Sequence, residues 1–174
     1  GFICGGSGSG TPYLYKTIDG GNNWSLVTGV SFGNTLWGDI EVINEDTLWL
    51  VDRDALSGGV FRSVNAGINW ARIYFGGGSV QPEKIYMLNS RTGFMSTSFR
   101  TYKTTNGGFN WQESDVKGFK DIHFADSLTG WKAYNASNQD SNMQKTTNGG
   151  INWYRQQLPV GGNISIFSNM GNFE

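Results

Sequence analysis

One short segment recurs four times along the 174-residue chain, and no other feature constrains the fold as strongly. The copies span residues 15–24, 61–70, 102–111 and 144–153. Each has a basic residue, then Ser or Thr, then Asp or Asn two positions later, Gly two further on, and Trp three after that. The four tryptophans are 46, 41 and 42 residues apart. Similar segments at such a regular spacing predict an array of equal structural units.

A weaker motif lies between these segments. Apolar, polar and apolar residues alternate from Ile40, Ile85, Ile122 and Ile164, and an aromatic residue follows nine positions later in each case. Such alternation is typical of a strand with one buried face. Each repeat therefore predicts four short strands, and a unit of about 40–45 residues with four strands has the size of a propeller blade. Helical periodicity is absent, so we expect an all-β fold.

The recurring segment has the chemistry of a sharp hairpin turn. Its glycines tolerate a positive φ, its Asp or Asn can accept backbone hydrogen bonds, and its Trp can bury a large ring against the same or a neighbouring blade. We expect these positions to be structural in all four copies. They are Thr17, Asp19, Gly21 and Trp24; Ser63, Asn65, Gly67 and Trp70; Thr104, Asn106, Gly108 and Trp111; and Thr146, Asn148, Gly150 and Trp153.

These segments resemble the Asp-box, or BNR repeat, of sialidases, sortilin-type receptors, xyloglucanases and photosystem II assembly-factor propellers. The additional motif at 126–131, which precedes the box residues 145–150, looks most like the assembly-factor group and related repeats of secreted bacterial proteins. The resemblance implies a β-propeller with four-stranded blades, in which the boxes lie at the blade periphery, away from the catalytic or binding face. Three boxes carry Asn in place of Asp, which a structural turn tolerates.

The aromatic residue that ends the weaker motif, which we call the aromatic frame, predicts how the repeats divide the chain. Phe2 fits the same position as Trp49, Phe94, Trp131 and Phe173. We therefore expect one domain, 1–174, with repeats at approximately 1–38, 39–82, 83–119 and 120–161, and with 162–174 as a closing strand beside Gly1 and Phe2. Three arrangements stay open: a closed four-blade ring, part of a larger ring, and self-association in which the terminal strand completes a neighbouring subunit.

Composition excludes several classes of partner. The net charge is −1 and no basic cluster stands out, so nucleic acid is not an expected partner. The single Cys4 and the lone His123 argue against a disulfide and against a metal site, and no cofactor is expected. No apolar run approaches membrane-spanning length, so membrane insertion is not expected. The chain starts at Gly1 without a methionine or signal peptide, which indicates a processed product or a piece of a longer protein.

No motif for catalysis emerges, so we predict no catalytic residues. Sialidase chemistry needs converging arginines, but Arg62 belongs to the repeat, and nothing supports a hydrolytic pair such as Asp39 and Asp121. We therefore expect a non-enzymatic interaction scaffold of a secreted or cell-surface protein, extracellular or periplasmic, binding protein or glycan through the propeller face. Trp37, Tyr86 and Tyr134 are candidate sugar platforms. The alternative is a fragment of an Asp-box glycoside hydrolase.

Overall fold

The computed structural model describes residues 1–5, 13–28, 37–53, 58–73, 81–134 and 142–157. Within these ranges every regular element is a β-strand, which confirms the all-β prediction. None of the described residues form a helix with the length and hydropathy that crossing a bilayer requires.

The strands form four antiparallel sheets, and within each sheet neighbouring strands are consecutive in the sequence. The first sheet contains β1 (Phe2–Gly5), β2 (Tyr13–Lys16) and β3 (Ser25–Leu26). The second contains β4 (Trp37–Val42), β5 (Leu48–Asp52), β6 (Gly59–Ser63) and β7 (Ala71–Ile73). The third contains β8 (Pro82–Met87), β9 (Gly93–Thr97), β10 (Thr101–Thr104) and β11 (Gln112–Asp115). The fourth contains β12 (Asp121–Phe124), β13 (Gly130–Ala133), β14 (Met143–Thr146) and β15 (Tyr154–Arg155).

All four sheets share one register. The aromatic residue of the frame lies opposite the basic residue of the box in every sheet: Phe2 opposite Lys16, Trp49 opposite Arg62, Phe94 opposite Lys103, and Trp131 opposite Lys145. By this register β1 is equivalent to β5, β9 and β13. The described part of the first sheet therefore contains no counterpart of β4, β8 and β12.

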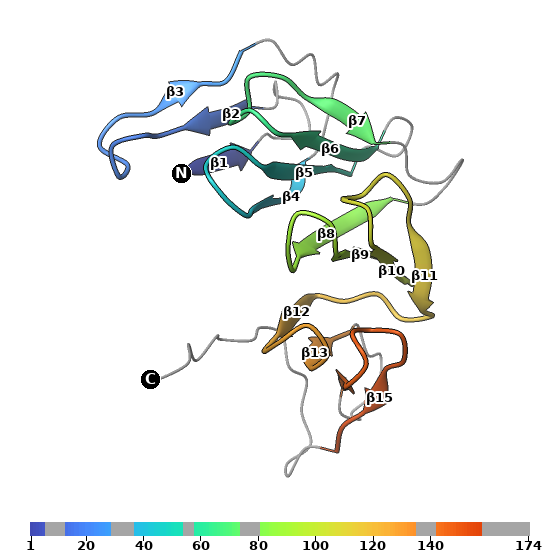
Figure 1. The fold of residues 1–174 in the computed structure, drawn as a ribbon. Coiled ribbons are helices and arrows are strands. Elements are labelled where there is room, and N and C mark those ends of the chain that lie inside the picture. The colour runs from blue at the N-terminus through green and yellow to red at the C-terminus, as the bar shows by residue number, and fades with distance from the viewer. Residues whose placement is uncertain (6–12, 29–36, 54–57, 74–80, 135–141, 158–174) are drawn as a thin grey trace.

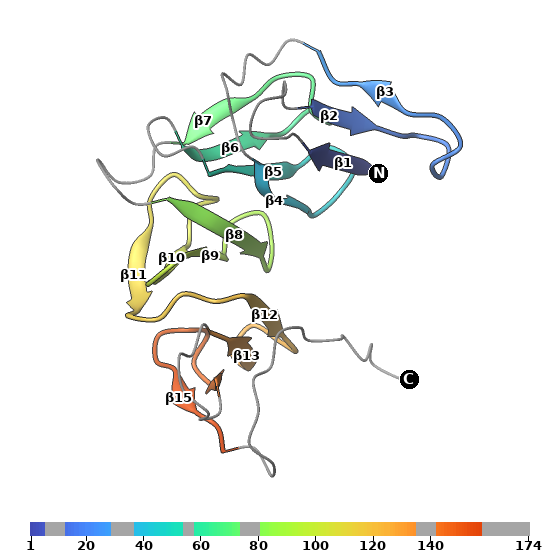
Figure 2. The ribbon, with the colours of Figure 1, turned by 180° about the vertical axis from the view of Figure 1, so that it is seen from behind.

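The sheets radiate from one side of the molecule in an open arc (Figure 1). β1, β4, β8 and β12 lie on the inner side, whereas β3, β7, β11 and β15 lie on the outer side, and the reverse view shows the same order (Figure 2). The first and fourth sheets are at opposite ends of the arc, so the described residues do not close a four-blade ring. The predicted closing strand, 162–174, and its pairing with Gly1 and Phe2 lie outside the described residues.

Neighbouring sheets are joined by one repeated contact. In each repeat the basic side chain covers the aromatic ring opposite it, at 5.2–5.9 Å from the centroid. The same pair then holds a backbone carbonyl of the next box. Lys16 Nζ donates to the Ala66 carbonyl at 3.3 Å, and Lys103 Nζ to the Gly149 carbonyl at 2.6 Å. At the middle junction the Trp49 indole donates to Gly107, at 3.1 Å. We call this aromatic and basic couple the docking pair.

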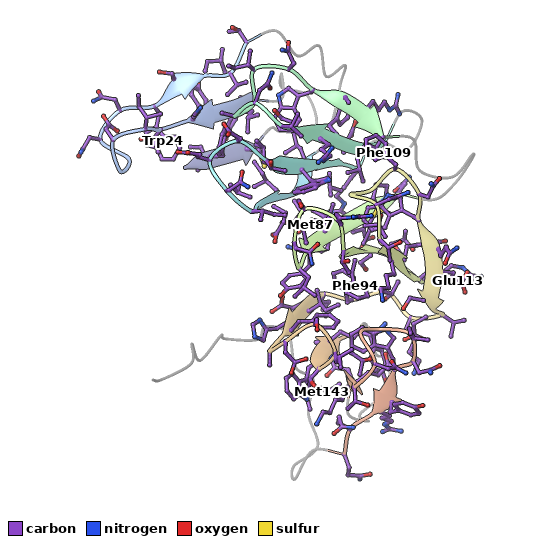
Figure 3. All side chains as sticks on the ribbon, viewed as in Figure 1. Trp24, Met87, Phe94, Phe109, Glu113 and Met143 are labelled. Atoms are coloured by element: carbon purple, nitrogen blue, oxygen red, sulfur yellow. The ribbon has the colours of Figure 1, made fainter. Side chains whose placement is uncertain are left out.

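The hydrophobic core is divided between the junctions rather than shared by the whole molecule. One cluster joins the second and third sheets and contains Trp49, Val51, Val60, Ile73, Ile85, Met87 and Met95. Another joins the third and fourth sheets and contains Phe94, Phe119, Ile122 and Phe124. Phe94 lies between these two sheets (Figure 3). Each sheet thus depends on its neighbours for burial, as expected of stacked repeats.

A buried ion pair also joins the third and fourth sheets. Lys132 of β13 is fully buried, and its ammonium lies 2.8 Å from Asp115 Oδ2. The same nitrogen donates to Thr101 Oγ1 at 2.7 Å and to the Lys117 carbonyl at 2.9 Å. Burial lowers the pKa of Lys132 to about 8, although Asp115 opposes that shift. Three oxygen partners replace the water that the ammonium loses, so the charge is held inside the junction.

Candidate functional site

The four boxes adopt the same hydrogen-bonded turn. In every copy the Ser or Thr hydroxyl accepts the N–H of the residue four positions on, at 2.9 Å. That hydroxyl donates to the side-chain Oδ1 of the Asp or Asn, at 2.8–3.1 Å. Oδ1 in turn accepts a backbone N–H four positions further along, at 2.8–3.0 Å. Gly21, Gly67, Gly108 and Gly150 all have positive φ, a conformation that is strained for residues with a side chain. The polar groups of the box are thus occupied within the turn.

The box tryptophans differ from the equal burial that their common register predicts. Trp70, Trp111 and Trp153 are half-buried, whereas Trp24 is 39% exposed. Trp153 packs edge-on against Phe94 of the preceding repeat, with centroids 6.1 Å apart. Trp24 lies at the outer end of the first sheet, away from the other sheets (Figure 3). The prediction was wrong for Trp24 because the described chain supplies no preceding repeat for the first box to pack against.

A row of polar side chains runs along the inner strands and links them. Asp39 Oδ2 of β4 accepts the backbone N–H of Ile85 at 3.1 Å. Glu41 Oε1 accepts that of Met87 at 3.3 Å. The Tyr86 hydroxyl repeats the second contact one repeat later, where it accepts the Phe124 N–H at 3.3 Å. The backbone N–H groups of Ile85, Met87 and Phe124 therefore have acceptors on side chains of the previous repeat.

Glu41, Tyr86 and His123 occupy one position of the repeat, but the sequence pattern does not predict that the first two bridge neighbouring sheets. The signal was present, because a polar residue recurs there between two apolar ones. Whether that polar residue reaches the next strand depends on the distance between sheets, and a sequence pattern does not contain that distance.

Two carboxyl groups of this row have raised pKa values. Asp39 and Glu41 are two residues apart on β4, so their side chains lie on the same face of the strand. Burial raises the pKa of Glu41 to about 7, and the nearby Asp39 adds to the shift. Burial also raises the pKa of Asp39, against the opposing effect of Lys84, whose Nζ lies 3.7 Å away. The pKa of the Cys4 thiol is raised by burial and then by Asp39.

The other candidate groups named from the sequence do not converge. Asp39 and Asp121 belong to the second and fourth sheets, with the third sheet between them (Figure 1). Arg62 covers the Trp49 ring, and a further arginine, Arg53, pairs with Glu83 at 3.8 Å. Among the described residues no three His, Cys, Asp or Glu side chains gather as a metal site.

An open cavity of about 540 Å³ lies between the first and second sheets. Lys16 lines it from the first sheet, and Val42, Glu45 and Asp46 line it from the second, so both signs of charge are present. Val42 is 43% exposed, although its place in the alternating motif predicts burial. The inner strand that would cover Val42 is missing from the described part of the first sheet.

One edge of β1 adjoins this cavity. Gly1 exchanges two backbone hydrogen bonds with Thr17, at 2.8 and 2.9 Å. Partners in an antiparallel ladder alternate, so the backbone groups of Phe2 and Cys4 point away from β2. Among the described residues no strand pairs with that edge.

No protein-family model matches the chain, and no curated protein matches it. Solved structures do. YCF48 from Cyanidioschyzon merolae has a TM-score of 0.67 and 17% identity over 95% of this chain and 54% of its own. YCF48 bound to D1 peptide has a TM-score of 0.62 and 19% identity over 86% of this chain and 49% of its own. The GH74 enzyme of Niastella koreensis has a TM-score of 0.66 and 18% identity over 88% of this chain and 27% of its own.

The chain thus spans about half the length of the YCF48 chains and about a quarter of the GH74 enzyme. At this level of sequence identity, the structural similarity shows only that the fold is shared. The four radiating sheets are blades of a β-propeller, as the resemblance in the sequence implied.

Proposed function

We propose that the chain is a non-enzymatic interaction scaffold that binds an extended segment of a protein partner. The observation that carries the proposal is the edge of β1 with which no described strand pairs, beside the cavity lined by Lys16, Glu45 and Asp46. An edge strand offers main-chain hydrogen bonds to an added strand, and an adjoining pocket selects side chains. The likeness to YCF48, which has been solved with a peptide, supports a protein partner over a glycan.

The inner polar row supports a scaffold role in a different way. Asp39, Glu41 and Tyr86 hold the backbone of the next repeat, so their first task is to fix the spacing of the sheets. A rigid array presents its binding edge without an ordering cost, which favours affinity. The proposal also locates the scaffold outside the cytoplasm, as the resemblance to repeats of secreted proteins implies; fractionation of the native cells tests that location.

The experiment selects short random peptides from a displayed library on the purified chain and measures their affinity for two variants. Cys4→Pro removes the N–H that an added strand needs, and Pro is tolerated on edge strands. Cys4→Ala keeps the N–H and is the matched control. We expect selected peptides to bind the parent and Cys4→Ala chains and to lose binding to Cys4→Pro. Equal binding by all three chains, or a library that yields no binder, contradicts the proposal.

One observation favours a second candidate, part of a glycoside hydrolase. Glycosidases need a carboxylic acid that keeps its proton near neutral pH and a second carboxylate close by. The pKa of Glu41 at about 7 and the neighbouring Asp39 meet those two requirements in part. Incubation of the chain with xyloglucan and with a sialoside separates the candidates. The scaffold proposal predicts no turnover, whereas turnover that Glu41→Gln abolishes would establish the hydrolase.

A further inference from the structure

We propose that Arg62 and Arg91, at the junction between the second and third sheets, bind the carboxylate of an acidic side chain on a protein partner. This inference goes beyond the partner segment proposed for β1, because it uses other residues on another part of the surface. Both sheets that form the junction are described, and the site lies between them.

Arg62 differs from the basic residues of the other internal docking pairs. Lys16 and Lys103 each donate to a carbonyl of the next box, at 3.3 and 2.6 Å. At the middle junction the equivalent carbonyl, that of Gly107, accepts the Trp49 indole N–H instead. Within the described part of the chain the Arg62 guanidinium therefore donates no hydrogen bond, and its Nε is buried without an acceptor.

Two aromatic rings hold this guanidinium in place. Its Cζ lies 5.3 Å from the centroid of Trp49 and 5.7 Å from that of Phe109. Phe109 belongs to the third box, is 60% exposed and lies where the second and third sheets meet (Figure 3). A guanidinium attracted to ring faces keeps its N–H groups at the edge of its plane. The rings therefore orient the guanidinium while its donors stay available to a ligand.

Arg91 brings a second positive charge to the same junction. Its carbonyl accepts the Gly107 N–H at 2.7 Å, and a Cβ at Gly107 would lie 3.7 Å from Arg62 Cζ, so Gly107 is a common neighbour of both arginines. Asp46 and Leu128 hold the equivalent position beside the second and fourth boxes. Neither arginine forms an ion pair with a carboxylate in the described ranges.

Two neighbouring cations without a counter-charge favour an anion as the ligand. A negative group offsets the repulsion between the arginines and supplies the acceptor that the buried Nε of Arg62 lacks. A carboxylate fits the planar fork of a guanidinium, because two parallel N–H···O bonds can form. The chemistry of the site therefore matches an aspartate or glutamate side chain.

The neighbouring boxes favour a protein segment as the source of that carboxylate. Ile68 and Ile151 hold the position of Phe109 in the second and fourth boxes, and they are 67% and 66% exposed. Exposed apolar side chains that recur at one register offer contacts to the apolar residues of a polypeptide, whereas the hydroxyl groups of a sugar gain little from them. We therefore expect the site to select an acidic residue flanked by apolar ones.

NMR titration of the purified chain tests the site with two capped pentapeptides that differ in one residue. One peptide has a glutamate between two leucines, and the other has glutamine in its place. We expect the glutamate peptide to shift the Arg62 Nε–H resonance, because a carboxylate supplies the missing acceptor. The glutamine peptide should bind about fivefold more weakly or worse. Glucuronate and inorganic phosphate are titrated separately, and both should bind more weakly than the glutamate peptide.

Three variants are compared through the backbone amide shifts around Gly107. Arg62→Lys keeps the charge and matches the other boxes but removes the guanidinium fork, and Arg91→Gln removes the second charge at an exposed position. Each change should weaken binding of the glutamate peptide by about fivefold or more. Arg100→Gln is the matched control, because Arg100 lies in the turn between β9 and β10 and pairs with Glu113. It should leave binding unchanged.

The amide spectra also show whether each variant folds, and the two peptides decide the question on the parent chain alone. Equal binding of the two peptides, or binding of neither, overturns the proposal. So does unchanged affinity for the glutamate peptide in both Arg62→Lys and Arg91→Gln. Tighter binding of glucuronate or phosphate than of the glutamate peptide also overturns it, because the ligand would then not be a protein segment.

Discussion

Replacing Phe94 by Ala should strongly destabilise the junction between the third and fourth sheets. Phe94 is completely buried, stacks on Phe124 with centroids 4.8 Å apart and meets the edge of Trp153 at 6.1 Å. A buried aromatic ring removes about 200 Å² from water, which at about 25 cal/mol per Å² corresponds to about 5 kcal/mol. Since Ala retains part of this burial, we expect a loss of about 3–5 kcal/mol.

Urea denaturation followed by tryptophan fluorescence measures this loss as a change in the free energy of unfolding. Phe99→Ala serves as control, because Phe99 lies in the turn between β9 and β10 and is 78% exposed, and it should shift stability by less than about 0.5 kcal/mol. The reasoning is refuted if Phe94→Ala costs less than about 1 kcal/mol, or if the two variants lose equal stability.

Three further changes test other parts of the structure. Thr104→Val removes the hydroxyl that accepts the Gly108 N–H at 2.9 Å and should cost about 1–3 kcal/mol, measured by urea denaturation. Lys132→Met leaves the carboxylate of Asp115 buried without its partner and should cost about 3–5 kcal/mol, and adding Asp115→Asn should recover part of that loss. The pKa of Glu41 rises from 4.5 to about 7 on folding, so its contribution is fully present below pH 4.5 and is lost as the pH rises through 7. Glu41→Gln should therefore flatten the pH dependence of the melting temperature in that window.

The fold class followed from the sequence because its determinants are local. Three features act within about ten residues: a turn that needs positive φ, a Ser or Thr that caps the turn, and an alternating strand. Because the four copies agree, they indicate the same structure throughout the chain. The all-β array of four sheets was therefore predicted. The choice between a closed four-blade ring and part of a larger ring stayed open, because ring curvature depends on how neighbouring sheets pack rather than on any one repeat.

Details that depend on neighbours were predicted least well. Trp24 occupies the same register as Trp153, yet its exposure differs because burial comes from the preceding repeat. Val42 matches Met87 in the strand pattern but borders a cavity instead of a packed sheet. The pKa of Glu41 likewise reflects burial between sheets, which the sequence pattern alone does not contain.

All four boxes share one local geometry, and the second, third and fourth boxes are in addition covered by the repeat before them. Hydrogen exchange by NMR at the amides of Gly21, Gly67, Gly108 and Gly150 tests the effect of that cover directly, because all four donate to a box hydroxyl at 2.9 Å. We expect slow exchange at Gly67, Gly108 and Gly150 in the three covered boxes and much faster exchange at Gly21. Equal exchange at all four amides would contradict it.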